Sequence, residues 1–340
     1  MTEPNHIEMK HRRPTRVDVA LKAGVAPSTV TLILTDKGDD LRIPETTQNR
    51  VKEAARSLGY YPNRHIQSVL RGRSGILGLY LRPDQYGRPY GYWTTTVWCL
   101  QRAAAELEIQ ILVHNAPEGA STEDNFARQA GGIVDGVMIL NSRQDPIVKR
   151  ILEAKLPAVE VGDPFSELPF VGLDSTQGIR LIMEHLNENG YKQPAFMSYR
   201  TEYVENSQAR IQEFQRGASK LFGIQHPEKR CVEGVDAFEA FPLLSHLDPA
   251  PDCLVCGSDE LAYEVLAICE RSGIEVPGKL AVTGYDCLAA MGTGRVLTSV
   301  STPLEEMARL AFQKLLNVID GKPYEHDTLL SVGLRVGDTT

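Results

Sequence analysis

Residues 15–34 read TRVDVALKAGVAPSTVTLIL. Thr15 with Asp18 three positions later is typical of a helix start, because each side chain can bind a backbone N–H group that the first turn leaves free. An apolar stripe follows at i, i+3 and i+4, formed by Val17, Ala20 and Leu21. Gly24 is expected to end this helix, since glycine enters the left-handed conformation at little cost.

Two more short helices are expected before residue 60. The second begins at Pro27, a residue well suited to the first helical position, and turns Val30, Ile33 and Leu34 inward. After a loop at 35–42, the third starts near Glu45 and ends at Gly59. Its apolar residues, at spacings of 0, 3, 4 and 7, are Val51, Ala54, Ala55 and Leu58. Two short helices and a third that closes their core form a helix-turn-helix arrangement, although any small helical bundle has the same periodicity.

The residues themselves are more specific than their periodicity. VDVALKAGVAPSTVTLIL, followed by IPETTQNRVKEAARSLGYYPN, strongly resembles the DNA-binding headpiece of the LacI/GalR repressor family. The likeness covers residues 15–63 almost without a gap. It implies an all-α helix-turn-helix domain at 1–61, of which we expect 1–14 to be a disordered tail, and a hinge at 62–74.

The resemblance implies that the second helix enters the major groove with its first residues at the base edges. The residues expected there are Pro27, Ser28, Thr29, Thr31 and Leu32. Ser and Thr can pair with either kind of base edge, whereas Pro and Leu can only pack, for instance on thymine methyl groups. Family members usually carry a polar or basic residue in place of Leu32, so the operator sequence stays undetermined. Phosphate contacts are predicted for Thr15, Arg42, Thr47 and Arg50.

NRHIQSVLRGRS, residues 63–74, looks like the hinge that the family folds into a helix only on its operator. Family members insert a leucine into the minor groove there, and the matching residue here is Val69. A shorter β-branched side chain should unstack bases less well. The hinge residues predicted to contact DNA are Asn63, Gln67, Val69 and Leu70. The alternative is that this segment is only a linker.

From Ile76 onward, strand-like apolar runs alternate with amphipathic helices. The runs are ILGLYL, IQILVH, DGVMIL, PAVEV, PAFMS, DCLVC and KLAVTG, and the helices include 94–108, 176–189, 207–222 and 259–272. This alternation predicts parallel sheets flanked by helices on both faces. Roughly 265 residues are many for one such sheet, so we expect a two-lobed α/β core at 75–340. CGSDELAYEVLAICERSGIEVPGKLAVTGYD and LTSVSTPLEEMARLAFQKLL resemble the LacI/GalR core, which has the fold of periplasmic-binding proteins.

A small-molecule effector site is expected between the lobes, at the carboxyl ends of strands. The resemblance implies that Arg210 grips ligand hydroxyls or carboxylates, and Asp286 follows a strand where its carboxylate can accept hydroxyl bonds. The further candidates are Tyr90, Asp163, Phe238, Ser258 and Asp259; the family usually has Asn in place of Ser258. Each candidate also has a structural alternative: packing for the aromatic residues, a helix cap for Asp259, and an ion pair for Arg210 with Asp286.

The charge is divided unevenly along the 340 residues. The net charge is -8, but residues 1–74 hold 13 Lys and Arg against 8 Asp and Glu, and the remainder is strongly acidic. This division predicts that only the amino-terminal part meets nucleic acid. The polar amino terminus lacks the apolar segment of a secretory signal, and no run reaches the roughly 18 apolar residues of a membrane helix. We therefore expect a cytoplasmic protein with no membrane partner.

No catalytic or metal-binding motif is found. The sequence lacks a G-x-S-x-G elbow, a phosphate-binding G-x-x-x-x-G-K-[ST] loop and an H-E-x-x-H helix. Of six cysteines, the only close pair is Cys253 and Cys256, whose side chains point opposite ways in a strand and are expected to be buried thiols. No metal, no cofactor and no enzyme activity are expected.

These observations predict a homodimeric transcription regulator, most simply a repressor. Two headpieces would bind a pseudo-palindromic operator of double-stranded DNA, because two-fold protein symmetry requires two-fold DNA. An effector, expected to be a sugar or a derivative, would bias lobe closure and so DNA affinity. The alternatives are a cytoplasmic sugar-binding protein and a sugar-metabolising α/β enzyme.

Overall fold

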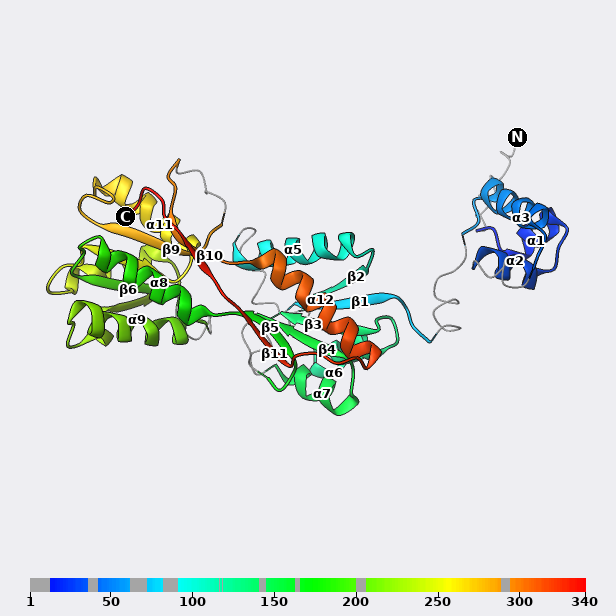
Figure 1. Ribbon diagram of the computed structural model, residues 1–340, viewed down its shortest axis with the longest axis horizontal. Coiled ribbons are helices and arrows are strands. Elements are labelled where there is room, and N and C mark those ends of the chain that lie inside the picture. Colours follow the sequence, from blue (N-terminus) through cyan, green and yellow to red (C-terminus); the bar gives the residue numbers. More distant parts are fainter. Residues whose placement is uncertain are drawn as a thin grey trace, which may run out of the picture. The chain divides into compact units, whose positions relative to one another are not determined.

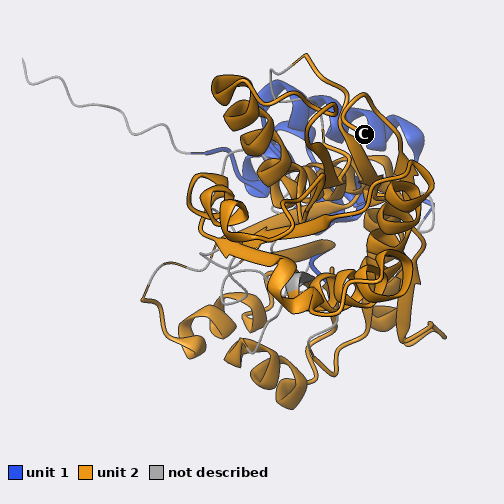
Figure 2. Cartoon of the chain, turned by 90° about the vertical axis from the view of Figure 1, so that its left-hand side faces the viewer, with its two compact units in different colours: residues 1–74 blue, residues 75–340 orange. Residues whose placement is uncertain are grey.

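The structure is a computed structural model, and it divides into two units, residues 1–74 and 75–340 (Figures 1 and 2). The residues that it describes are 13–35, 42–61, 72–81, 91–115, 117, 119–140, 145–162, 166–199, 206–288 and 294–340.

The first unit contains the helices α1 (Arg16–Ala23), α2 (Pro27–Leu34) and α3 (Glu45–Leu58). Thr15 and Asp18 form the predicted capping box at the start of α1, and Gly24 ends the helix in the left-handed conformation with φ 64°. The chain turns there, so that α1 and α2 are bent by 102° relative to each other. The shared core consists of Val19, Ala20, Ala23, Val30, Ile33, Val51, Ala54 and Ala55. The predicted helix-turn-helix arrangement is confirmed.

The first lobe of the second unit is a six-stranded sheet in the order β11-β5-β4-β3-β1-β2, paired in parallel throughout (Figure 1). Its strands are β1 (Ile76–Leu81), β2 (Gln110–Asn115), β3 (Gly136–Leu140), β4 (Ala158–Val161), β5 (Phe170–Leu173) and β11 (Asp327–Leu330). One face packs on α5 (Tyr92–Glu106) and α12 (Leu304–Asp320). The other face packs on α6 (Thr122–Ala130) and α7 (Pro146–Ala154). Helices therefore cover both faces, as predicted.

The second lobe repeats this plan with the order β12-β10-β9-β8-β6-β7. Its strands are β6 (Pro194–Tyr199), β7 (Cys231–Gly234), β8 (Cys253–Cys256), β9 (Ala281–Asp286), β10 (Thr298–Ser301) and β12 (Gly333–Arg335). Strand β12 runs antiparallel to β10, and the other described pairs are parallel. Its helices are α8 (Ser175–Glu188), α9 (Asn206–Phe222), α10 (Ala237–Ala240) and α11 (Asp259–Ser272), with the 3-10 turns η2 (Pro227–Arg230) and η3 (Phe241–His246).

Residues that alternate along a central strand of this lobe enter different cores. On β8, Cys253 joins the core beneath α8 and α9, whereas Cys256 joins the core beneath α10 and α11. Both are buried free thiols, as predicted. Burial is also the main cause that raises their pKa values, so neither is a reactive thiolate near neutral pH.

The chain passes between the lobes three times: from β5 to α8, from β10 to α12, and from β11 to β12. Hydrogen bonds join two of these crossings, because Asp174 N–H donates to Leu330 O at 2.9 Å and Val332 N–H donates to Gln177 Oε1 at 2.9 Å. The β5–α8 and β11–β12 crossings are therefore bonded to each other between the two sheets.

Within the described ranges, no single helix is long and apolar enough to span a membrane, although α1 and α2 taken together as a bent pair meet that criterion. The described residues also contain no cluster of three or more His, Cys, Asp or Glu side chains that could hold a metal ion.

Candidate nucleic-acid interface and effector site

The predicted DNA-reading helix α2 carries no charged residue. Val30 and Ile33 are buried in the helical core, which turns the opposite side of the helix outward. On that side Ser28 is exposed, and Pro27, Thr29, Thr31 and Leu32 are partly exposed. The Thr31 hydroxyl donates to Pro27 O at 3.2 Å, so it is available to a base edge mainly as an acceptor. The face offered to DNA is neutral and combines hydroxyl with apolar groups.

Basic side chains lie on the elements next to α2. Arg50 of α3 is exposed, and its Nε donates to Ala23 O, at the end of α1, at 2.8 Å. This bond fixes the guanidinium, and among the described residues neither Nη group has a hydrogen-bond partner. Arg42 is also exposed, and Thr47 is partly exposed. Such side chains have the chemistry of phosphate contacts that set position without reading sequence.

Thr15 has a defined structural role. Its hydroxyl donates to Asp18 Oδ2 at 2.7 Å and accepts from Asp18 N–H at 3.4 Å. A phosphate contact through the same hydroxyl stays a prediction. The hinge residues Asn63, Gln67, Val69 and Leu70, and the effector candidates Tyr90 and Asp163, lie outside the described residues.

In the second lobe, Arg210 lies deep among the strand ends. It is 6% exposed, its Nη1 donates to Gly257 O at 2.5 Å, and its guanidinium lies 3.6 Å from the centroid of the Tyr285 ring. Its Nε has no hydrogen-bond partner among the described residues. Tyr285 is itself buried and donates from its hydroxyl to Ser175 O at 3.3 Å. Arg210 is therefore held by a carbonyl and an aromatic face, and its buried Nε remains available to a further acceptor.

Asp286 ends β9 next to this group, and the backbone here is strained. The φ angles of Asp286 and Cys287 are 109° and 54°, values that non-glycine residues rarely adopt. Hydrogen bonds hold the strained turn from both sides: Thr302 Oγ1 donates to Asp286 O at 3.1 Å, and Cys287 N–H donates to Ser299 Oγ at 3.1 Å. Strain that the surroundings maintain in this way is concentrated at functional sites, which supports the predicted role of Asp286.

Asp259 differs from its predicted role at the effector. The side chain has no exposed surface; it accepts from Leu288 N–H at 2.6 Å and from the Ser299 hydroxyl at 2.5 Å. Burial raises the pKa of Asp259 to about 7, against the lowering effect of these hydrogen bonds. The carboxylate thus supports the turn that carries Asp286 from inside the lobe.

Ser258 takes the cap position that was the structural alternative for Asp259. The Ser258 hydroxyl oxygen accepts from Leu261 N–H at 3.3 Å and so caps α11. Both residue types are good caps, and the capping position goes to Ser258 because the Asp259 carboxylate is bound to the 286–288 turn.

Phe238 also differs from its expected place. It is half exposed on α10 and packs under Arg271, whose guanidinium lies 5.5 Å from the centroid of its ring. Arg271 belongs to the last turn of α11, whereas Ser258 caps its first turn. At 1.5 Å per residue, these turns are about 18 Å apart along the helix. Phe238 therefore stacks at the far end of α11 from Arg210, Tyr285 and Asp286, which we call the strand-end group.

Tyr199 and Glu260 had no place in the predicted site. Tyr199 ends β6, and its hydroxyl donates to Glu260 Oε2 at 3.3 Å. Tyr92 and Trp93, at the start of α5, pack edge to face at 5.0 Å between ring centroids. The position of Tyr199 at the carboxyl end of a predicted strand is a signal that could have identified it; Glu260 has no comparable local signal.

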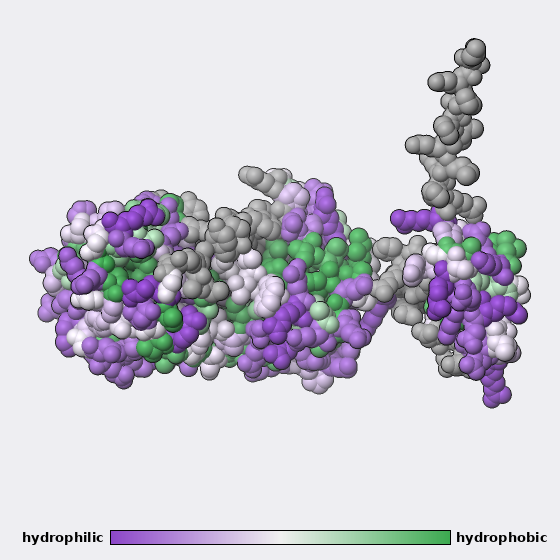
Figure 3. All heavy atoms as spheres, turned by 90° about the horizontal axis from the view of Figure 1, so that it is seen from above, coloured by the Kyte–Doolittle hydropathy of each residue, from purple (hydrophilic) through white to green (hydrophobic). Residues whose placement is uncertain are grey.

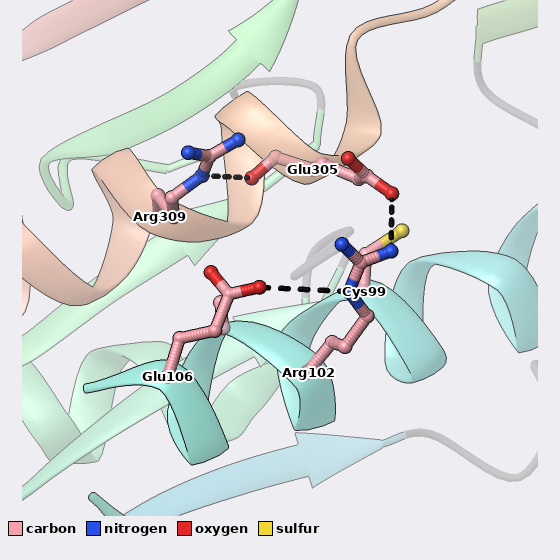
Figure 4. A pocket seen from close by; sticks show the side chains of 6 residues that line it. Cys99, Arg102, Glu106, Glu305 and Arg309 are labelled. Atoms are coloured by element: carbon pink, nitrogen blue, oxygen red, sulfur yellow. Dashed lines mark hydrogen bonds and ion pairs between the residues drawn. The ribbon is translucent and has the colours of Figure 1, made fainter. Parts of the chain in front are cut away.

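A shallow pocket between α5 and α12 is separate from the strand ends (Figure 4). Its charged side chains bind one another: Arg102 pairs with Glu305 at 2.7 Å and with Glu106 at 3.5 Å. The Cys99 thiol in this pocket has a pKa that burial, and then Glu305, raise above its usual value. Arg102 is thus neutralised by carboxylates of the pocket itself, and we assign no ligand to it.

Comparison with known proteins follows the same division of the chain. Residues 16–63 match the family model of bacterial regulatory proteins of the lacI family, and residues 183–340 match the model of a periplasmic binding protein-like domain. The first unit is a LacI-family domain. The whole chain is 28% identical over 329 residues to the HTH-type transcriptional regulator CelR of Thermobifida fusca, which covers 93% of this chain and 95% of CelR. It is 27% identical over 322 residues to the HTH-type transcriptional repressor CytR of Escherichia coli K12, which covers 91% of this chain and 90% of CytR.

Solved structures with the same fold include LacI-family proteins in complexes. A CelR–cellobiose complex has a TM-score of 0.70 at 26% identity and covers 96% of this chain and 100% of its own. The lac repressor dimer bound to operator and the anti-inducer ONPF has a TM-score of 0.82 at 21% identity and covers 96% and 99%. The relatives named here are transcription regulators and not enzymes, and this chain, with its LacI-family domain, is a DNA-binding transcription regulator.

Proposed function

We propose that this chain is a ligand-responsive repressor that binds a pseudo-palindromic operator as a homodimer in the cytoplasm. The observation that carries the proposal is the helix-turn-helix unit whose outward α2 face is neutral and polar, with Arg42 and Arg50 exposed beside it. Neutral hydroxyl and apolar groups suit base edges, and the arginines suit phosphates. The hinge residue Val69 would enter the minor groove at the operator centre.

The effector that fits the strand-end group best is a sugar or a sugar derivative. Arg210 and Asp286 present a rigid donor and a carboxylate acceptor, and a polyhydroxyl ligand can bind both at once. The cellobiose complex of the relative CelR supports this class of ligand. Effector binding would change the closure of the lobes, and the hinge would pass that change to the headpiece.

The second copy of the chain would cover part of lobe 1. Apolar residues gather on the face that carries α5 and β2 (Figure 3), where Trp98, Leu107 and Leu112 are 51%, 43% and 40% exposed. Strand β2 is the last strand of its sheet, so a two-fold partner could pack beside it. Leu112→Lys should convert dimers to monomers in sedimentation and weaken operator binding at low protein concentration; retention of the dimer would place the interface elsewhere.

We expect the core to bind its effector without converting it. Its strand-end group contains a stacked arginine and a supported carboxylate, but no nucleophile has been identified beside a general base. A turnover assay with cellobiose and monosaccharides tests this directly, because product formation by the purified chain would support the enzyme alternative. Release from DNA by an unaltered sugar would support the regulator.

The deciding experiment selects DNA with the full-length chain from random double-stranded sequences. We expect a pseudo-palindrome to be enriched, with binding that weakens steeply with salt. A chain starting at Gly75 should stay folded and lose this binding; equal binding by the truncated chain would overturn the proposal.

The effector test uses a thermal-shift panel of cellobiose, monosaccharides, sugar phosphates and nucleosides. A ligand at 100 times its Kd should stabilise the core by about 2.7 kcal/mol. Arg210→Ala and Asp286→Ala should each cost roughly 2–5 kcal/mol of that ligand's affinity while operator affinity without ligand persists. If both variants keep full ligand affinity, the effector binds elsewhere.

A further inference from the structure

The outward side of α2 lacks the side chains with which proteins most often identify guanine and adenine. The helix has the sequence PSTVTLIL, without arginine, lysine, asparagine or glutamine. Arginine or lysine commonly binds O6 and N7 of guanine, and asparagine or glutamine commonly binds N6 and N7 of adenine. Because Val30 and Ile33 are buried, Ser28 and Leu32 are turned away from the core, with Thr31 beside them. Any base preference of this helix must therefore come from hydroxyl and apolar groups.

The hydroxyl hydrogen of Thr31 is already bound within the helix. Thr31 Oγ1 donates to Pro27 O at 3.2 Å, and one turn later Thr35 Oγ1 donates to Thr31 O at 2.8 Å. A threonine that donates to the carbonyl four residues earlier has only lone pairs left for a further partner. In the major groove those lone pairs can accept from the amino group of adenine or cytosine, whereas the edge of guanine presents acceptors only. The Thr31 hydroxyl therefore favours an amino group and disfavours guanine.

Leu32 places an apolar group next to this hydroxyl. It is partly exposed and lies one turn after the exposed Ser28, on the same side of the helix. A leucine side chain can neither donate nor accept a hydrogen bond, so in the groove it can only pack. The apolar group that distinguishes one base from the others there is the C5-methyl group of thymine. Packing on this methyl group removes apolar surface of both partners from water.

We propose that α2 recognises A·T pairs, because Leu32 packs on the thymine methyl group and Thr31 accepts from the adenine amino group. An A·T pair presents both groups in the major groove, whereas a C·G pair presents an amino group without a methyl group. The inference rests on the proposed function, since it requires α2 to lie in the major groove of an operator. It goes further by naming the base pair that the helix selects.

The first experiment compares the operators that full-length proteins select from random double-stranded DNA. Wild type should enrich an A·T pair at the position that Leu32 contacts in each half-site. Leu32→Ala should accept C·G as well as A·T at this position, because Thr31 still requires an amino group while the methyl group no longer contributes. The remaining positions of the operator should be the same for both proteins.

The second experiment removes the methyl group from the DNA and leaves the protein unchanged. The selected operator is made with deoxyuridine in place of the thymine at that position, and binding is measured by fluorescence anisotropy at one salt concentration. Wild type should bind the uracil operator about fourfold more weakly for each half-site changed, which is the effect of exposing roughly one methylene equivalent of apolar surface. Leu32→Ala should bind the two operators equally.

Leu21→Ala is the matched control for this comparison. Leu21 is an exposed leucine on α1, a helix to which we assign no base contact. Its removal should leave the ratio of thymine to uracil affinity as it is in wild type.

The role of Thr31 is tested by replacing the adenine of the same pair with purine, which lacks the amino group. The cost of weaker base pairing is the same for every protein. Wild type should therefore lose about fivefold more affinity than Thr31→Val, which keeps the shape of the side chain without its hydroxyl.

Three results would overturn the proposal. Equal affinity of wild type for the thymine and uracil operators would remove the role of Leu32, and this measurement needs no variant to fold. Equal losses for wild type and Thr31→Val on the purine operator would remove the role of Thr31. Enrichment of guanine at the position that changes in Leu32→Ala would contradict both. If wild type enriches no sequence at all, the repressor assignment itself fails, and that outcome is distinct from an operator that is selected but insensitive to the methyl group.

Discussion

Replacing Asp259 by asparagine should remove a pH dependence from the stability of lobe 2. In the folded protein the pKa of Asp259 is about 7, against an ordinary value of 3.8, and burial is the main cause. Because the folded state has the higher pKa, it holds the proton more tightly than the unfolded state. The stabilising contribution is therefore complete below about pH 4 and is lost as the pH rises through 7.

The magnitude follows from the two pKa values. Between pH 5 and pH 8 the unfolded carboxyl is already ionised, while the folded one loses most of its proton. Integrating the difference in bound protons gives a loss of about 2.5 kcal/mol of unfolding free energy over this range. The side chain has no exposed surface, so solvent screening does not reduce this figure in the way that it would at the surface.

An asparagine side chain at this position can keep the hydrogen bonds without the charge. Its carbonyl oxygen can accept from Leu288 N–H, and its amide can donate to Ser299 Oγ, which still accepts from Cys287 N–H. Asp259→Asn should therefore match wild type near pH 5 and exceed it by about 2 kcal/mol at pH 8.

Urea unfolding of both full-length proteins at pH 5, 6, 7 and 8 measures this difference. Subtracting one series from the other cancels the titration of the remaining groups. Ser299→Ala serves as a second variant: its hydroxyl lowers the pKa of Asp259, so its loss should move the fall in stability to higher pH. Parallel curves for wild type and Asp259→Asn across the whole range would refute the reasoning, because they would mean that the carboxylate keeps one protonation state throughout.

Three further predictions concern single contacts. Arg50→Ala should weaken operator and random DNA alike and lower the slope of log affinity against log salt by about 1 in anisotropy titrations; a change confined to one base position would contradict the phosphate role. Lys314→Met should cost about 2–4 kcal/mol in urea unfolding, because its buried Nζ donates to Phe170 O, His326 O and Thr328 Oγ1; a loss below 1 kcal/mol would contradict this. Gly24→Ala should lower headpiece stability by about 1 kcal/mol in thermal melts, since its φ is 64° with no atom within 4 Å to add a clash, and Gly24→Asn should recover part of the loss.

The headpiece was predictable from the sequence because its boundaries are local. Thr15 with Asp18, and the glycines at 24 and 59, act through hydrogen bonds within a few residues, and the helices begin and end where these residues indicate. The strands β5, β7, β10, β11 and β12 were not predicted. They are three or four residues long, and pairing with neighbours distant in sequence defines them. Periodicity has too few residues to act on in such short segments.

The positions of candidate residues were predictable only where a side chain lies near one strand end. Arg210 and Asp286 lie near the ends of β8 and β9, and their roles toward an effector stay predictions. Ser258 and Asp259 are both good caps, so the sequence alone could not assign the cap to one and the turn to the other. Glu260 contacts Gly91 across 169 positions of sequence, and nothing near either residue signals the other. Contacts of this kind depend on how the two lobes close.

Side chains at the start of α11 contact both the turn that carries Asp286 and the other lobe. Ser258 fixes the start of the helix, Asp259 binds the strained turn that carries Asp286, and Glu260 reaches α5 in the other lobe. The three residues are consecutive, with Ser258 capping the 14-residue helix that Asp259 and Glu260 begin, so we expect them to move together. We expect a ligand that binds Asp286 to shift Asp259 through the 286–288 turn, and with it the Glu260 carboxylate beside Gly91. This link predicts that Asp259→Ala, which removes the bonds to the 286–288 turn, and Glu260→Ala are not additive in their effect on the distance between the lobes, measured between spin labels at the exposed Lys149 and Lys220, because both act through the same helical turn.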